Sequence, residues 1–155
     1  MRRTRAGLLG LTFLAELTAC AATGDTSLKI EAFSIAPATV GDGESFDVTW
    51  KVSHPTKTGY VTESGLFVGT PADLSSASEL DARRLFNLAT TAGVANGVDD
   101  SSKTCTRTGT TLRCGSTEGG RDIAGVTDFT FRACSSYVLS PDDVCEMRPV
   151  SITFP

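Results

Sequence analysis

Short stretches of alternating apolar and polar residues run along the chain from Leu28 onward. The clearest is 46–52, FDVTWKV, in which Phe46, Val48 and Trp50 point to one side and polar residues to the other. Strict alternation of this kind predicts a strand with one face buried in a core. Because Trp50 stands on the apolar side, we expect it in that core and not at a ligand site.

Five further segments show strand-like patterns, separated by turn residues such as the cluster 37–43. In the first of them, Leu28, Ile30 and Ala32 alternate with charged residues and are expected to share the buried face. Gly65 interrupts another, which predicts a β-bulge at that point. The five segments are 28–32, 60–68, 110–114, 126–134 and 146–154.

In the middle of the chain the apolar residues do not recur with a single helical or strand period. Ser76 followed by Glu79 is a capping-box pattern, which predicts a short helix near 76–82. We expect a further strand over 83–89. Short strands separated by regular turns, without a long helix, predict an all-β fold: an antiparallel sandwich of about seven strands.

Part of this pattern is more specific. Segment 35–52 places Pro37, Val40 and Gly43 in a turn before the alternating strand that carries Trp50. This order resembles the opening of bacterial immunoglobulin-like and fibronectin type III-like domains, and the resemblance implies a sandwich of that type. Two later segments resemble the last two strands of such domains, namely 129–134 and 149–154.

The first twenty residues, MRRTRAGLLGLTFLAELTAC, have the layout of a secretory signal. Three arginines precede an apolar run from Leu8 to Ala15, which is too short to span a membrane. The segment ends in Leu-Thr-Ala-Cys, an aliphatic residue and two small ones before Cys20. This ending resembles the lipobox of bacterial lipoproteins. The resemblance implies that Cys20 is lipidated and that residues 1–19 are removed as a signal peptide.

The same interpretation divides the rest of the chain. Residues 20–27 are the lipidated cysteine and a small polar tether, and residues 28–155 are the sandwich domain. A diacylglyceryl group supplies two acyl chains, enough for stable anchoring. We therefore expect a protein held in the bacterial cell envelope, and Ala21 favours the outer membrane by resemblance to enterobacterial sorting. The open alternative is ordinary cleavage near Ala19, leaving a soluble secreted protein.

Four cysteines follow Cys20, and an even number in an exported chain predicts two disulfides. Four cysteines allow three pairings, of which we expect the two local ones. Cys105 and Cys114 flank a turn that contains glycine, and Cys134 and Cys145 flank the connection between the last two strands. Zinc sites use closer cysteine pairs with histidines nearby, so we expect no metal.

The chain offers little catalytic chemistry. The single histidine, His54, sits beside a proline after a predicted strand, and we expect it to be structural or solvated. Asp99–Ser102 and Pro141–Asp143 lack the spacing of a calcium loop and are expected to be solvated loops. The glycine-rich segment 115–120 lacks the lysine of a phosphate-binding loop. We expect no catalytic residue and no cofactor, and hence no enzyme.

The loop inside the second predicted disulfide has the composition of a contact site. Tyr137, Val138 and Leu139 stand close to Asp142 and Asp143, at a position that often contacts partners in fibronectin-like domains. A constrained apolar tip with an acidic rim is a candidate binding loop. The alternative is that Val138 and Leu139 fold back over the core.

The net charge limits the classes of partner that the chain can bind. The chain has 14 Lys and Arg against 18 Asp and Glu, a net charge of −4, and three of its arginines lie in the leader. The acidic remainder is unsuited to nucleic acid, which is bound through many cationic contacts. We expect a lipid-anchored, non-catalytic binding or structural module with an envelope protein or glycan as partner. The alternatives are an accessory subunit of an envelope secretion or surface-assembly complex and, as the weaker one, a carboxylate-based hydrolase.

Overall fold

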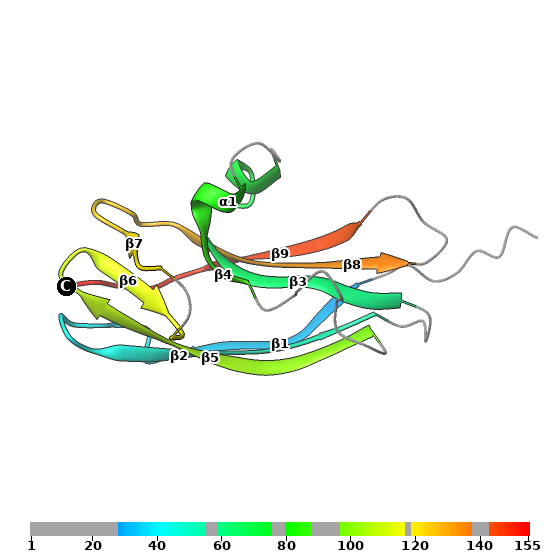
Figure 1. Ribbon diagram of the computed structural model, residues 1–155, viewed down its shortest axis with the longest axis horizontal. Helices are drawn as coiled ribbons and strands as arrows, with labels where there is room; N and C mark the ends of the chain where they lie inside the picture. The colour runs from blue at the N-terminus through cyan, green and yellow to red at the C-terminus, as the bar shows by residue number, and fades with distance from the viewer. Residues whose placement is uncertain (1–27, 55–58, 76–79, 88–96, 117–118, 138–142) are drawn as a thin grey trace, which may run out of the picture.

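The structure, a computed structural model, consists of two antiparallel sheets packed face to face (Figure 1). This confirms the predicted all-β sandwich. The residues that it describes are 28–54, 59–75, 80–87, 97–116, 119–137 and 143–155.

The first sheet has the strand order β1-β2-β5-β6-β7, and the second has the order β4-β3-β8-β9. Strands 1, 2 and 5 therefore face strands 3, 8 and 9, a division consistent with an immunoglobulin-like fold. In the first sheet the bounds are β1 Lys29–Ala36, β2 Ser45–Ser53, β5 Val98–Thr108, β6 Thr111–Cys114 and β7 Arg121–Asp122. In the second they are β3 Gly59–Val68, β4 Arg84–Asn87, β8 Phe129–Tyr137 and β9 Val144–Val150.

Helical structure within these residues is limited to two short turns, η1 (Asp73–Ser75) and α1 (Leu80–Arg83). The second overlaps the short helix predicted near 76–82, although residues 76–79 lie outside the described residues. Strand β4 follows directly, as the pattern over 83–89 predicts. None of the described helices is long and apolar enough to cross a membrane.

The prediction for the first strand is wrong at Ala32. The pairing of β1 with β2 slips between Ile30 and Ala32, which marks a bulge at Glu31. The extra residue reverses the alternation, so Ala32 is exposed while Phe33 and Ile35 pack against the core. After the extra residue, the side chains that would have pointed outward face the core instead.

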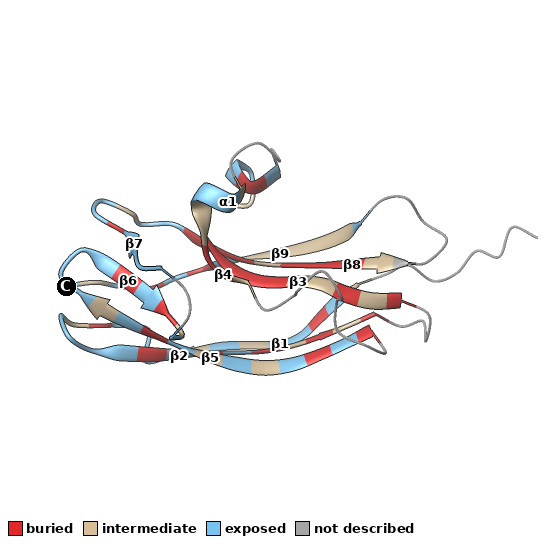
Figure 2. Ribbon diagram, in the orientation of Figure 1, coloured by how far each residue is buried: buried red, intermediate tan, exposed pale blue. Residues whose placement is uncertain are grey.

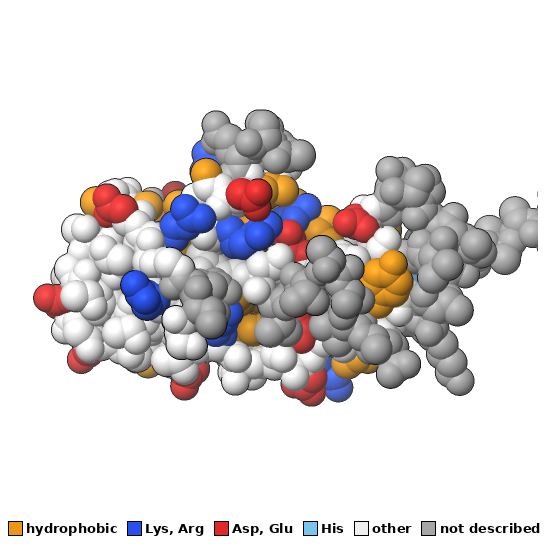
Figure 3. Space-filling view, in the orientation of Figure 1, with side chains coloured by type: hydrophobic (Ala, Val, Ile, Leu, Met, Phe, Trp, Pro, Cys, Tyr) orange, Lys and Arg blue, Asp and Glu red, His pale blue; other side chains and the backbone are white. Residues whose placement is uncertain are grey.

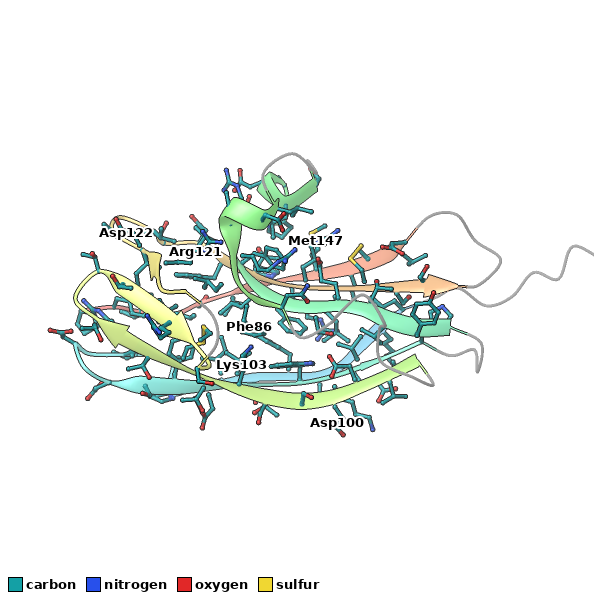
Figure 4. The ribbon with its side chains drawn as sticks, viewed as in Figure 1. Phe86, Asp100, Lys103, Arg121, Asp122 and Met147 are labelled. Atoms are coloured by element: carbon teal, nitrogen blue, oxygen red, sulfur yellow. A yellow bond between two sulfur atoms is a disulfide. The ribbon has the colours of Figure 1, made fainter. Side chains whose placement is uncertain are left out.

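The centre of the core is aromatic, and Trp50 lies in it as predicted. Its ring centroid is 5.3 Å from that of Phe86 and 5.7 Å from that of Phe131, which joins the two sheets. The indole Nε1–H donates a hydrogen bond of 2.6 Å to the Asp99 carboxylate, so the buried polar edge of the ring is satisfied. Figure 4 shows Phe86 and Lys103 between the sheets, where the ammonium lies 5.4 Å from the ring centroid.

The prediction of a solvated loop at Asp99–Ser102 is also wrong, because these residues belong to β5. This strand pairs with β2 along its length, from Val98 opposite Ser53 to Thr106 opposite Ser45. Asp99 is 2% exposed, whereas Asp100 points away from the sandwich (Figure 4). The inward positions of β5 before its cysteine are polar or charged, so apolar alternation could not reveal the strand.

Strand β3 corrects the expectation for Gly65. The bulge lies earlier, between Val61 and Glu63 in the pairing with β8. Gly65 instead permits close approach of β4, because a Cβ there would lie 2.4 Å from the carbonyl oxygen of Phe86.

Candidate functional site

The structure describes only the ends of the predicted binding loop. Strand β8 ends at Tyr137, and the next described residue is Asp143, which is exposed. Val138, Leu139 and Asp142 lie outside the described residues, and so does Cys20, the predicted lipidation site. The loop tip and the lipid attachment therefore stay predictions.

Both predicted disulfides are present. Cys105 bonds to Cys114 and Cys134 bonds to Cys145, with Cα atoms 4.0 and 4.1 Å apart. In each case the two cysteines are direct partners on neighbouring antiparallel strands. Directly opposite residues of an antiparallel pair come this close at positions without backbone hydrogen bonds. Each disulfide thus cross-links one strand pair, β5 with β6 and β8 with β9.

The two disulfides lie on different faces of their sheets. Cys105 and Cys114 are 0% and 1% exposed and belong to the core between the sheets. Phe131 and Ala133 of β8 also face that core, so Cys134 lies on the opposite, outer face of the second sheet. It is nevertheless only 2% exposed, which shows that this outer face is covered.

A group of charged side chains surrounds the Cys134–Cys145 disulfide. The Arg132 Nη1 group contacts Glu63 Oε1, and both side chains are nearly buried, with 14% and 13% exposed. Arg84 of β4 lies 4.0 Å from the other Glu63 oxygen. We call Glu63, Arg84, Arg132 and this disulfide the outer-face cluster. Figure 3 shows basic and acidic side chains gathered below α1, over this sheet.

The charged groups reach both sulfur atoms. Arg132 Nη2 lies 3.3 Å from the Cys145 Sγ, and Glu63 Oε1 lies 3.6 Å from the Cys134 Sγ. Arg132 therefore bridges the carboxyl group and the disulfide. Cys145 stands on the edge strand β9 and is partly exposed, unlike Cys134.

The carboxyl group of this cluster is electrostatically unusual. Burial raises the pKa of Glu63, and the negative charge of Asp143 acts in the same direction, while Arg132 and Arg84 oppose them. The effect of Asp143 shows that the end of the predicted binding loop lies within electrostatic reach of the cluster. The site therefore places a nearly buried carboxyl group beside a disulfide and a guanidinium.

The outer face around the cluster is covered by the segment between β3 and β4. Phe67 and Leu74 are buried although neither belongs to the core between the sheets. The Arg84 guanidinium lies 5.9 Å from the centroid of the Phe67 ring and 2.9 Å from the Asp81 carboxylate. Arg121 of β7 donates hydrogen bonds to the carbonyl oxygens of Arg84 and Asp81, which ties this cover to the first sheet.

The described ends of the predicted binding loop, Tyr137 and Asp143, lie at the end of the sandwich where β1 begins, which we call the β1 end (Figure 1). The Ile30 N–H donates to the Glu146 carboxylate at 2.7 Å, and Arg148 donates to the Ile30 carbonyl at 2.7 Å. The start of β1 is therefore held to β9, which begins just after the loop (Figure 1). Leu28 and the two ends of the loop lie at one end of the molecule.

The opposite end has a cleft of about 260 Å³. The Arg107 guanidinium at this cleft donates to the carbonyl oxygens of Val40, Gly109 and Pro155 and lies over the Phe154 ring. Through these hydrogen bonds Arg107 joins the turns that contain Val40 and Gly109 to the C-terminal residues. The cleft is lined by Arg107, Gly109, Thr110, Ile123, Ala124, Gly125, Val126, Thr127 and Phe154.

No three His, Cys, Asp or Glu side chains gather into a metal site among the residues that the structure describes. His54 is buried beside Gly59, where an added Cβ would lie 2.2 Å from its Nδ1. This position agrees with a structural histidine. The backbone N–H of His54 donates to the carbonyl oxygen of Gly97.

Sequence reasoning missed the charged part of the outer-face cluster, although one signal was present. In the predicted strand Phe129 and Phe131 alternate with polar residues, which puts Arg132 and Cys134 on the same outer face. Glu63 had no such signal, because the bulge just before it, between Val61 and Glu63, breaks the alternation. No protein-family model matches the chain, and no curated protein or solved structure matches it either.

Proposed function

We propose that the chain is a lipid-anchored lipoprotein of the bacterial cell envelope whose sandwich acts as a non-catalytic binding or structural module. The observation that carries the proposal is the pair of disulfides, one in each sheet. Disulfides persist in oxidising compartments outside the cytoplasm. The lipobox-like ending at Cys20 supplies the export signal and the anchor that this location requires.

The position of β1 sets the orientation that an anchored molecule would have relative to the membrane. Eight residues, 20–27, separate the start of the mature chain from Leu28. Fully extended they span about 25–30 Å, so the β1 end stays close to the membrane. The described ends of the predicted binding loop, Tyr137 and Asp143, would then lie next to the membrane, and the turns and the cleft of the opposite end would point away from it.

This orientation favours one of the alternative functions. A partner that reaches a loop so close to the bilayer is most simply one that is held at the membrane itself. An accessory subunit of an envelope secretion or surface-assembly complex meets that condition. The partner would be a protein or glycan that contacts Tyr137, Leu139 and the acidic residues beside them.

The mass of the intact protein, purified from its own membranes with and without reductant, tests the anchor and the compartment. We expect a chain that starts at Cys20, carries added acyl mass and gains four hydrogens on reduction, two for each disulfide. A Cys20→Ala variant, which removes the acceptor thiol, should lose the acyl mass. An unlipidated wild-type chain would contradict the anchor, and an unchanged mass on reduction would contradict the oxidising compartment.

The binding role is tested by replacing both Tyr137 and Leu139 with serine and cross-linking the protein in membranes. We expect the thermal midpoint to change little while the cross-linked partner is lost. The matched control is Ala124→Lys at the cleft of the opposite end, which should keep the partner. A large fall in the thermal midpoint of the serine variant would show instead that these side chains cover the core.

A further inference from the structure

We propose that Cys134–Cys145 is a thiol–disulfide exchange site, open to a dithiol reductant in the folded protein, whereas Cys105–Cys114 is closed to it. The proposal goes beyond the binding function and does not depend on lipidation of Cys20. It rests on the exposure of the two disulfides and on the charged groups that contact one of them.

Access distinguishes the two disulfides. Cys105 and Cys114 belong to the core, so a reductant reaches them only when the sheets separate. Cys145 is partly exposed on the edge strand β9, while its partner Cys134 is nearly buried. The attack is therefore directed to the Cys145 sulfur, and Cys134 becomes the leaving group of the first step.

The exchange balances as two displacements. A thiolate of the reductant attacks the Cys145 Sγ, the bond between the two cysteine sulfurs breaks, and its electron pair leaves on the Cys134 Sγ. The second thiolate of the reductant then attacks the other reductant sulfur, the one bonded to Cys145 in the mixed disulfide, and releases Cys145 as a thiolate. The reductant is oxidised to a disulfide, Cys134 and Cys145 are reduced, and the two protons lost by the reductant equal those the cysteines take up.

The outer-face cluster assists both displacements. The Arg132 guanidinium, 3.3 Å from the Cys145 Sγ, attracts the incoming thiolate to that sulfur in the first displacement and stabilises the negative charge that leaves on it in the second. The Glu63 carboxyl group lies 3.6 Å from the Cys134 Sγ and contacts Arg132, so it holds the guanidinium beside the disulfide. Arg84 on β4 and Asp143 after the loop are the other charged groups that act on Glu63.

Reduction also changes the constraint on the predicted binding loop. The disulfide closes the chain from Cys134 to Cys145 into a covalent ring around that loop. Breaking it removes the covalent link and leaves the described strands β8 and β9 joined by their backbone pairing. The redox state of the disulfide would therefore change the covalent constraint on the two strand ends that flank the loop, without separating the sheets.

The test is the rate at which each disulfide is reduced in the native full chain. The oxidised protein is treated with dithiothreitol, quenched with an alkylating reagent at timed intervals and mapped by peptide mass. We expect Cys134–Cys145 to be reduced at least about tenfold faster than Cys105–Cys114. Equal rates would overturn the proposal, and so would reduction of Cys134–Cys145 no faster than global unfolding measured on the same sample.

A set of variants tests the part played by the charged groups. Arg132→Gln should slow reduction of Cys134–Cys145 about tenfold and leave Cys105–Cys114 unchanged, while Arg132→Lys should restore most of the rate. The matched control is Arg113→Gln on β6, next to the other disulfide in the sequence, which should alter neither rate. An unchanged rate in Arg132→Gln would overturn the assistance by Arg132, and the ratio in the wild-type chain still decides whether the site is open.

Discussion

The two disulfides have nearly the same local geometry and opposite surroundings. Each joins direct partners on neighbouring antiparallel strands, with sequence separations of 9 and 11 residues. One faces the apolar core, and the other faces outward, among an arginine, a glutamate and the segment that covers them. The spacing of the cysteines predicts the bonds, but the face on which each pair lies determines its chemistry.

The outer faces of the two sheets differ in the same way. In the first sheet the outward residues of β2 are exposed or partly exposed, so burial alternates along the strand, whereas β3 and β8 are buried over longer runs (Figure 2). On the outside of the first sheet Thr104 donates a 2.6 Å hydrogen bond to Asp47 in an exposed position. On the outside of the second sheet Phe67 and Cys134 are buried, while Cys145 on the edge strand β9 is partly exposed. The second sheet is thus packed on both faces along β3 and β8.

The largest effect is expected from removing the disulfides one at a time. Replacing Cys105 and Cys114 together with alanine should cost about 3–5 kcal/mol, the sum of loop closure and lost core packing. Replacing Cys134 and Cys145 together should cost about 2–3 kcal/mol, because the loop-closure term dominates there. Urea unfolding of the two variants measures the difference. Equal losses would mean that the two surroundings do not differ in packing.

The next effect tests whether the outer face of the second sheet is packed like a core. Phe67→Ala should lower the free energy of unfolding by about 3 kcal/mol, although this side chain lies outside the space between the sheets. The control is Val98→Ala at a position 39% exposed, which should cost less than about 0.5 kcal/mol. A loss below about 1 kcal/mol for Phe67→Ala would show that the cover contributes little packing.

A smaller effect concerns the dependence of stability on pH. Burial raises the pKa of Glu63 in the folded chain above its ordinary value of 4.5. At pH values between the unfolded and the folded pKa, the folded chain therefore binds more protons at this group than the unfolded chain does. Stability from this group is therefore present at low pH and lost as the pH rises through the folded pKa. Glu63→Gln should remove that loss.

The measurement is the difference in unfolding free energy between wild type and Glu63→Gln from pH 4 to pH 8. Wild type should lose stability relative to the variant as the pH rises. The pKa values of Glu31 and Asp73 are lowered and give the opposite trend, but both groups are present in the two proteins and cancel in the difference. A difference that grows in favour of wild type with rising pH would show that the ion pair with Arg132 outweighs burial.

The smallest effect is expected on the exposed outer face of the first sheet. Lys51 and Glu31 form an ion pair of 3.5 Å in which both side chains are more than a third exposed. Lys51→Gln should leave the thermal midpoint unchanged within measurement error, because solvent and salt screen such pairs. A salt-dependent drop in the midpoint would show that this face is more ordered than its exposure indicates.

The sequence was most informative where one side of a strand is apolar. The alternation in 46–52 predicted β2 and the burial of Trp50, and the turn containing Gly109 predicted the first disulfide. It was least informative where backbone pairing replaces apolar packing. Strand β5 carries Asp99 and Ser101 on its inward side, and its position is fixed by pairing with β2 and by the hydrogen bond from Trp50.

The same limit explains the candidate site. Cys134 and Cys145 could be found by counting, and Arg132 could be placed on their face by alternation. Glu63 and Arg84 could not, because both stand at irregular pairings of β3, with β8 and with β4. Bulges are set by the tertiary contacts of a particular fold, so a pattern read along the chain gives no warning of them.

The two hydrogen bonds between the Ile30 backbone and β9 have a mechanical consequence. A force applied to the chain before Leu28 enters the molecule at the start of β1 and is shared at once with the second sheet through Glu146 and Arg148. Because β1 lies alongside β2, a pull along the strand loads many backbone bonds together in shear instead of opening them singly. Strand β1 is thus expected to resist a pulling force. Removing the side chain of Glu146 or Arg148 would lower the force at which β1 detaches.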